Sequence, residues 1–153
     1  MKSNVVSIGP DATLLDAARL LAQKKVGTLP VVDKTGKLIG LSSMRKIVRF
    51  FLPDFINVLE DVDFVNDFGA IDIPSQIDIK KAEKISVREM MDEPESAEKD
   101  SSLMRALALM VTHDLQDLPI TDEGMLVGIA SRVDIGRAFL LSWLDEPAKS
   151  KKK

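Results

Sequence analysis

The second half of the chain repeats the first, and this duplication limits the possible folds more than any other feature. Residues 11–52 align with residues 100–140 after one single-residue gap, with 15 identities over 41 aligned pairs. The identical pairs include Pro30 with Pro119 and two pairs of glycines. A chance match of two amphipathic helices would not also align prolines and glycines. The fold is therefore expected to contain two copies of one unit.

Each copy has the same local pattern. A helix with an apolar stripe is predicted after Thr13 and again after Ser102, because both residues can cap a helix. Two β-rich runs joined by a short turn with Asp and Gly then predict a hairpin, and a second helix follows. The β-rich runs are 28–32 with 37–41 and 118–121 with 125–130. With a short first strand at 5–8 and 95–98, the unit is β-α-β-β-α.

One such unit is too small to bury a core alone, since it has only about 45 residues. Two units stacked face to face and related by a pseudo-two-fold axis would complete one core. The predicted fold class is therefore α+β, with two β-α-β-β-α units packed through their sheets. The hairpins are expected in the middle and the helices outside.

The composition excludes several classes of function. Cysteine is absent and His113, expected at a helix end, is the single histidine, which excludes thiol catalysis and imidazole metal clusters. The sequence has no glycine-rich phosphate loop and no nucleophile with a histidine base. A net charge of -3 gives no basic excess for nucleic acid, and no apolar run is long enough to span a membrane. We predict a soluble, cytoplasmic protein that is not an enzyme and holds no metal.

The hairpins and the helices that follow them resemble the CBS domain, named after cystathionine β-synthase. The segments that carry the resemblance are GTLPVVDKTGKLIGLSSMRKI in the first unit and DLPITDEGMLVGIASRVDI in the second. They combine a Leu-Pro strand, a glycine turn opened by Asp, and a step from strand to helix with the pattern Gly-x-x-Ser-x-x-Asp. Two such units in tandem resemble a CBS pair, or Bateman module.

The resemblance divides the chain into four predicted segments. Residues 1–52 are the first CBS unit, with a truncated lead-in, and residues 85–144 are the second unit. Between them, residues 53–84 form an acidic, partly helical inserted linker, and residues 145–153 form a basic disordered tail. Residues 53–79 contain seven acidic residues and no Lys or Arg, together with several large apolar residues. This mixture favours a solvated acidic face beside a packed apolar face over a divalent-cation site.

By its resemblance, the chain is expected to be a regulatory module that senses an adenosine-containing nucleotide in the cleft between the units. AMP, ADP, ATP and S-adenosylmethionine are the candidate ligands, and binding is expected to change the arrangement of the module. The second unit matches the motif better. Its implied site residues are Leu118, Pro119 and Ile120 at the adenine edge, Asp134 at the ribose hydroxyls, and Ser131 and Arg132 at phosphate groups. Arg137 is expected to reach either a phosphate or a partner chain. Ser131 and Asp134 also have the spacing of a simple helix cap, which remains the alternative role.

The first unit departs from the motif at one position. Lys46 aligns with Asp134, and a lysine cannot accept hydrogen bonds from ribose hydroxyls. A weaker, empty or differently occupied second site is therefore predicted, while Arg45 and Lys46 are candidates to contact the phosphates of a nucleotide held elsewhere. Its candidate residues are Thr28, Leu29, Pro30, Ser43, Arg45 and Lys46.

The resemblance also implies partners. Two modules are expected to form a homodimer through their second helices, an unidentified regulated protein is a further partner, and no cofactor is required. The apolar candidates for the dimer contact are Phe50, Phe51, Phe139, Leu140, Leu141 and Trp143. The alternative function is a structural dimerisation or docking module with degenerate, empty pockets, which Lys46 and the insert at 53–84 favour.

Overall fold

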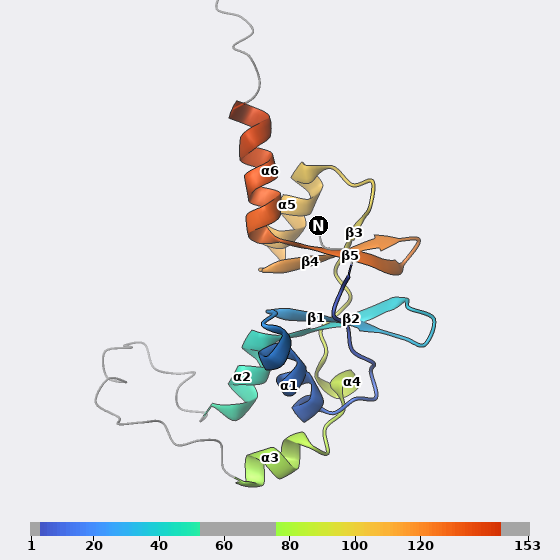
Figure 1. The fold of residues 1–153 in the computed structure, drawn as a ribbon, viewed down its shortest axis with the longest axis vertical. Helices are drawn as coiled ribbons and strands as arrows, with labels where there is room; N and C mark the ends of the chain where they lie inside the picture. The colour runs from blue at the N-terminus through green and yellow to red at the C-terminus, as the bar shows by residue number, and fades with distance from the viewer. Residues whose placement is uncertain (1–3, 53–75, 145–153) are drawn as a thin grey trace, which may run out of the picture.

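The computed structural model describes residues 4–52 and 76–144, which form two units with their sheets facing each other and their helices outside (Figure 1). The first unit contains α1 (Leu14–Lys24), β1 (Thr28–Val32), β2 (Leu38–Ser43) and α2 (Met44–Phe51). The helices α3 (Gln76–Ala82) and α4 (Val87–Met90) follow. The second unit contains β3 (Ala97–Glu98), α5 (Leu103–Thr112), β4 (Asp117–Asp122), β5 (Met125–Ser131) and α6 (Arg132–Leu144). This order confirms the predicted α+β fold of two repeated units.

The first strand of each unit is shorter than the sequence predicts. In the second unit β3 pairs in parallel with β4 over two residues. In the first unit Ile8 alone forms a parallel bridge, to Val31, with backbone hydrogen bonds of 3.0 Å to Pro30 and from Val32. The run at 5–8 is apolar and the run at 95–98 is polar, yet the polar run makes the longer ladder. Strand length at a sheet edge depends on backbone partners, which apolar content does not specify.

The two hairpins meet at their turns. Lys37 and Met125 form an antiparallel bridge, and their neighbours exchange two backbone hydrogen bonds of 3.0 and 3.1 Å, from Leu38 to Gly124 and from Leu126 to Gly36. Equivalent positions of the repeat thus contact each other, and each unit donates one of the two hydrogen bonds and accepts the other, as a pseudo-two-fold axis requires. Both turn glycines have a left-handed φ, +89° at Gly36 and +81° at Gly124, which favours glycine at these positions.

Each unit has its own buried cluster, which differs from the one shared core expected from the sequence. The cluster of the first unit is Ile8, Leu14, Ala17, Leu21, Leu29, Val31, Ile47, Ala82 and Val87. The cluster of the second unit is Ala97, Ala106, Met110, Leu118, Ile120, Ala130 and Ile135. The reason is geometric: the helices of each unit cover the outer side of that unit's own sheet, so their apolar faces meet within the unit.

The lead-in to the second unit packs on the first unit. Ala82 and Val87 are buried in the first cluster, and the Ile85 carbonyl accepts a 2.8 Å hydrogen bond from the N–H of Leu14. Farther along, Leu41 and Asp92 exchange backbone hydrogen bonds of 3.1 and 2.8 Å, so the linker crosses beside β2. The four segment boundaries stay predictions. Most of the acidic insert and the basic tail lie outside the described residues.

The described residues contain no helix that is both long enough and apolar enough to cross a membrane.

Substitution of Gly40 by alanine should destabilise the protein, because the linker approaches β2 closely at this position. An added Cβ would lie 2.5 Å from the Met91 sulfur and 3.0 Å from the backbone oxygen of Asp92. We expect the free energy of unfolding to fall by about 1–3 kcal/mol in urea denaturation. Gly9→Ala is the control, because its Cβ would meet nothing within 4 Å, and it should stay within about 0.5 kcal/mol of wild type. Equal stability of the two variants would contradict the close crossing.

Candidate functional site

A cavity of about 750 Å³ lies between the two units, a size typical of small-molecule sites. The first unit lines it with the start of β1 and the junction of β2 and α2, through Gly27, Thr28, Leu41, Ser43, Met44 and Arg45. The linker contributes Asp92, Glu93 and Glu95, and the segment after α5 contributes His113, Asp114, Leu115 and Gln116. Residues far apart in the sequence thus enclose one space.

Three of the six residues predicted for the first-unit site line this cavity, namely Thr28, Ser43 and Arg45. Leu29 and Pro30 are buried in β1 instead. The Ser43 hydroxyl accepts a 3.3 Å hydrogen bond from the N–H of Lys46 and so caps α2. The Lys46 ammonium forms an ion pair with Asp92, a residue of the cavity wall. The cavity wall therefore has a carboxylate, that of Asp92, beside Lys46, the position at which the second unit has Asp134.

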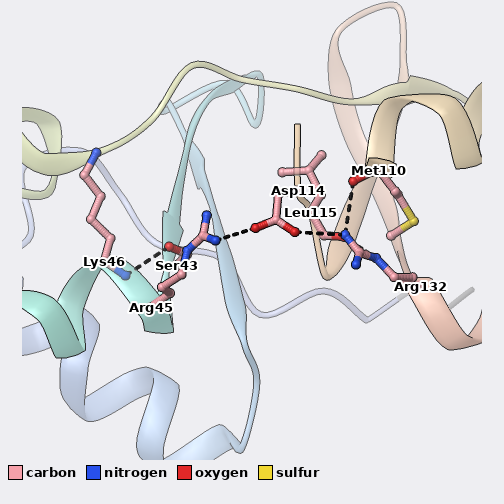
Figure 2. Close-up of polar contacts among 7 residues, drawn as sticks. All are labelled: Ser43, Arg45, Lys46, Met110, Asp114, Leu115 and Arg132. Atoms are coloured by element: carbon pink, nitrogen blue, oxygen red, sulfur yellow. Dashed lines mark hydrogen bonds and ion pairs between the residues drawn. The ribbon is translucent and has the colours of Figure 1, made fainter. Parts of the chain in front are cut away.

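The Asp114 carboxylate lies between two guanidinium groups that belong to different units (Figure 2). One oxygen pairs with Arg45 of α2, and the other lies 3.4 Å from Nη2 of Arg132. Hydrogen bonds first from Arg45 and then from Arg132 hold the pKa of Asp114 below its usual value. Asp114 has a left-handed φ of 50°, close to the 54° of Lys25, its equivalent after α1. The repeat thus places a residue with a left-handed φ at the equivalent position after both helices, as the C-cap of α1 and one residue beyond the C-cap of α5.

Arg132 also holds the end of α5. Its Nε donates to the Leu115 carbonyl at 2.9 Å and its Nη2 donates to the Met110 carbonyl at 3.1 Å (Figure 2). Carbonyls at a helix C-terminus need partners outside the helix, and a guanidinium supplies several donors. Arg132 therefore positions the segment that lines the cavity, a role that the sequence motif does not reveal.

Ser131 and Asp134 form a reciprocal cap at the start of α6. The Asp134 N–H donates to the Ser131 hydroxyl at 3.1 Å, and the Ser131 N–H donates to Asp134 Oδ2 at 3.4 Å. The capping role that the sequence left open is therefore present. An ionised carboxylate accepts more than one hydrogen bond, so capping does not conflict with a ribose contact.

The other residues predicted for the second-unit site have different surroundings. Leu118, Pro119 and Ile120 are buried in β4, the middle strand of its sheet, whose backbone pairs with β5 and, at Ile120, with β3. Their predicted contact with adenine stays a prediction. Arg137 is exposed and lies along a shallow apolar groove on α6, together with Val133, Leu140 and Leu141.

The predicted dimer residues differ between the two units. Phe50 and Phe51 contact each other edge to face, with centroids 5.1 Å apart, and pack against the first buried cluster. On α6, Leu140 and Trp143 are 61% and 70% exposed. Trp143 also contacts Phe139 within α6, with ring centroids 5.9 Å apart. The difference between the units is one of exposure, because Phe50 and Phe51 are half-buried.

The linker and second-unit walls of the cavity were missed by sequence reasoning. His113 is the C-cap of α5, as expected for a helix end, but its Nδ1 also lies 3.5 Å from Glu95 Oε1 in the cavity wall. The duplication could have indicated these walls. It implies a pseudo-two-fold axis, and across that axis the end of α5 faces the first hairpin. Among the described residues, no group of His, Cys, Asp and Glu is arranged to hold a metal ion.

Comparisons with known proteins agree on one family. The family model of the CBS domain matches residues 1–53 and 85–141. MJ1426, an uncharacterised protein of Methanocaldococcus jannaschii, is 31% identical over 153 residues, which cover 92% of this chain and 88% of that protein. The CBS-pair protein CBSX2 from Arabidopsis thaliana has a crystal structure with a TM-score of 0.69 at 25% identity, covering 94% and 92% of the two chains. The structure of CBSX2 in complex with AMP gives 0.65 at 26% identity and covers 93% and 92%.

Replacing Arg132 with alanine should destabilise the second unit, because Met110 and Leu115 lose a charged donor. We expect a loss of about 1–3 kcal/mol in the free energy of unfolding, measured by chemical denaturation. Arg132→Lys should recover only part of this, since one ammonium cannot reproduce a forked guanidinium. Arg137→Ala, at an exposed position on the same helix, is the control and should change stability by less than about 0.5 kcal/mol. Similar losses in both alanine variants would argue against the proposed hold on α5.

The contact between Arg45, Asp114 and Arg132 should weaken in acid. The pKa of Asp114 is lowered below its ordinary value of 3.8, so its stabilisation is present above about pH 4 and disappears as the pH falls through the lowered value. The difference in unfolding free energy between wild type and Asp114→Asn should therefore shrink as the pH falls from about 6 to 3. A difference that is constant over this range would show that the charge of Asp114 does not contribute.

Proposed function

This chain belongs to the CBS domain family, and on that premise we propose that it is a regulatory module, not an enzyme, that senses an adenosine-containing ligand between its units. The observation that carries the proposal is the cavity lined by both units and by the linker. Support also comes from CBSX2, a similar CBS-pair protein with a known AMP complex. We further propose a cytoplasmic homodimer whose arrangement a regulated protein reads.

A ligand in this cavity can act on the contact between the units. Arg45 of the first unit and Asp114 of the second unit line the cavity and pair with each other. A ligand that touches either side chain changes the free energy of that pair. A ligand shifts the equilibrium between two arrangements of the units only if it binds one of them more tightly. A difference in affinity would arise here if the pair of Arg45 and Asp114 differs between the two arrangements.

Two sites are proposed, one for each copy of the motif. In the second unit, Asp134 has acceptor capacity for ribose hydroxyls and Ser131 lies beside it at the start of α6. In the first unit, Asp92 supplies the cavity with a carboxylate beside Lys46. The linker would thus compensate for the lysine that replaces the acceptor of the motif.

One observation favours the alternative function of a dimerisation or docking module. The outer side of α6 exposes large apolar side chains, with Leu140 at 61%, Trp143 at 70% and Leu144 at 77%. Surfaces of this kind are typical of protein contacts. Under this alternative the protein would assemble normally and bind no nucleotide.

Thermal unfolding with AMP, ADP, ATP, S-adenosylmethionine and a guanosine nucleotide distinguishes the two functions. A ligand at a hundred times its dissociation constant stabilises a protein by about 2.7 kcal/mol. We expect at least one adenosine ligand to raise the melting temperature and the guanosine nucleotide to have no effect. A well-folded protein that responds to none of them would support the docking alternative.

Asp134→Ala should remove most of the stabilisation by AMP, leaving only the weak contribution of the cavity, and cost about 1 kcal/mol of helix-cap stability. Asp16→Ala is the matched control, because Asp16 forms the same kind of reciprocal cap with Thr13 at the start of α1. It should cost a similar amount of stability and leave the response to AMP intact. Isothermal calorimetry on both variants checks this, and unchanged AMP binding in Asp134→Ala would remove Asp134 from the site.

A further inference from the structure

The residues that line the cavity carry more negative than positive charge. Its wall contains four carboxylates, those of Asp92, Glu93, Glu95 and Asp114. Arg45 is the one Lys or Arg side chain among the described residues that line it. Two further cations that do not line the cavity, Lys46 and Arg132, pair with Asp92 and Asp114. Even when both are included, these four carboxylates outnumber the three Lys and Arg cations.

The cation inside the cavity is already engaged. Arg45 pairs with Asp114, whose other oxygen faces Arg132 (Figure 2). A phosphate that bound Arg45 would have to displace the Asp114 carboxylate. The displaced carboxylate would stay in the cavity wall, because Arg132 holds the adjoining segment through the carbonyls of Met110 and Leu115. Two negative groups would then lie close together and repel each other.

The remaining wall suits an uncharged base. Leu41, Met44 and Leu115 supply apolar surface, and Thr28 and Gln116 add neutral polar groups. The part of the cavity that suits a base is thus present without the free cations that a polyphosphate would need.

We infer that this cavity selects an adenosine ligand whose 5′ substituent is neutral or positively charged, and that it discriminates against phosphorylated nucleotides. Asp114 occupies, as an internal anion, the partner position that a ligand phosphate would take beside Arg45. A sulfonium group, as in S-adenosylmethionine, would instead be attracted by the acidic side chains Glu93 and Glu95. The inference rests on the proposed function, since it requires an adenosine group in the cavity.

Asp114→Asn tests the inference directly. It removes the internal anion, and asparagine tolerates the left-handed φ of 50° at this position. Calorimetry in an Asp134→Ala background isolates the cavity from the second-unit site. We expect the affinity for AMP and ATP to rise about fivefold or more, because one negative charge near the phosphate is removed. The affinity for adenosine should change less than about twofold, because adenosine has no phosphate. Asp11→Asn is the charge-matched control: Asp11 is 82% exposed, faces Arg88, and does not line the cavity.

The salt dependence of AMP affinity provides a second test. Repulsion of the phosphate by the cavity and attraction of the phosphate to Arg45 predict opposite effects of salt. In the Asp134→Ala protein, AMP affinity should rise as the salt concentration increases from about 0.05 to 0.5 M, because screening weakens repulsion. Attraction between a phosphate and Arg45 would instead weaken with salt. Tighter binding of ATP than of adenosine, or AMP affinity that falls with salt, would overturn the inference.

The same experiments separate this inference from the proposed function. If wild-type protein binds no adenosine ligand, both fail. If wild-type protein binds AMP but the Asp134→Ala protein binds neither adenosine nor S-adenosylmethionine, the sensing function stands and the inference about the cavity fails.

Discussion

Two backbone hydrogen bonds between the hairpin turns hold the two units in register. They are exchanged between equivalent positions around Lys37 and Met125, so the joint is symmetric although the sequences differ. Each unit keeps its own buried cluster, and the polar contacts across the boundary include this joint and the pair of Arg45 with Asp114. Any change in the arrangement of the two units would therefore have to disturb these contacts.

The fold was predictable because each local signal occurs twice. The caps at Thr13 and Ser102 and the paired glycine turns supported one another across the repeat, and all of them appear in the structure. The first strands were predicted less well, since the number of paired residues depends on the neighbouring strand rather than on the segment itself. The separate clusters were missed for a similar reason, because the helices of each unit were not assigned to the sheet of that unit.

The sequence predicted only those residues of the candidate site whose positions are fixed by a short motif. Ser43 and Arg45 were found because the step from strand to helix fixes their spacing, and both line the cavity. Asp92 and Asp114 were missed because their positions depend on the path of the linker and on how the units stack. Lys46 illustrates the limit: the sequence shows that a carboxylate is missing there, and only the fold shows that Asp92 stands beside it.

The crossing of the linker determines how chains of this kind can be cut and recombined. Ala82 and Val87 complete the buried cluster of the first unit, although Val87 already lies in the lead-in to the second copy. A chimaera joined at residue 84 would combine the first unit of one parent with core residues from the other. A junction just beyond Asp92, after its exchange of hydrogen bonds with Leu41, would leave each cluster made entirely of residues from one parent. The units of gene duplication and the units of packing therefore overlap instead of sharing one border.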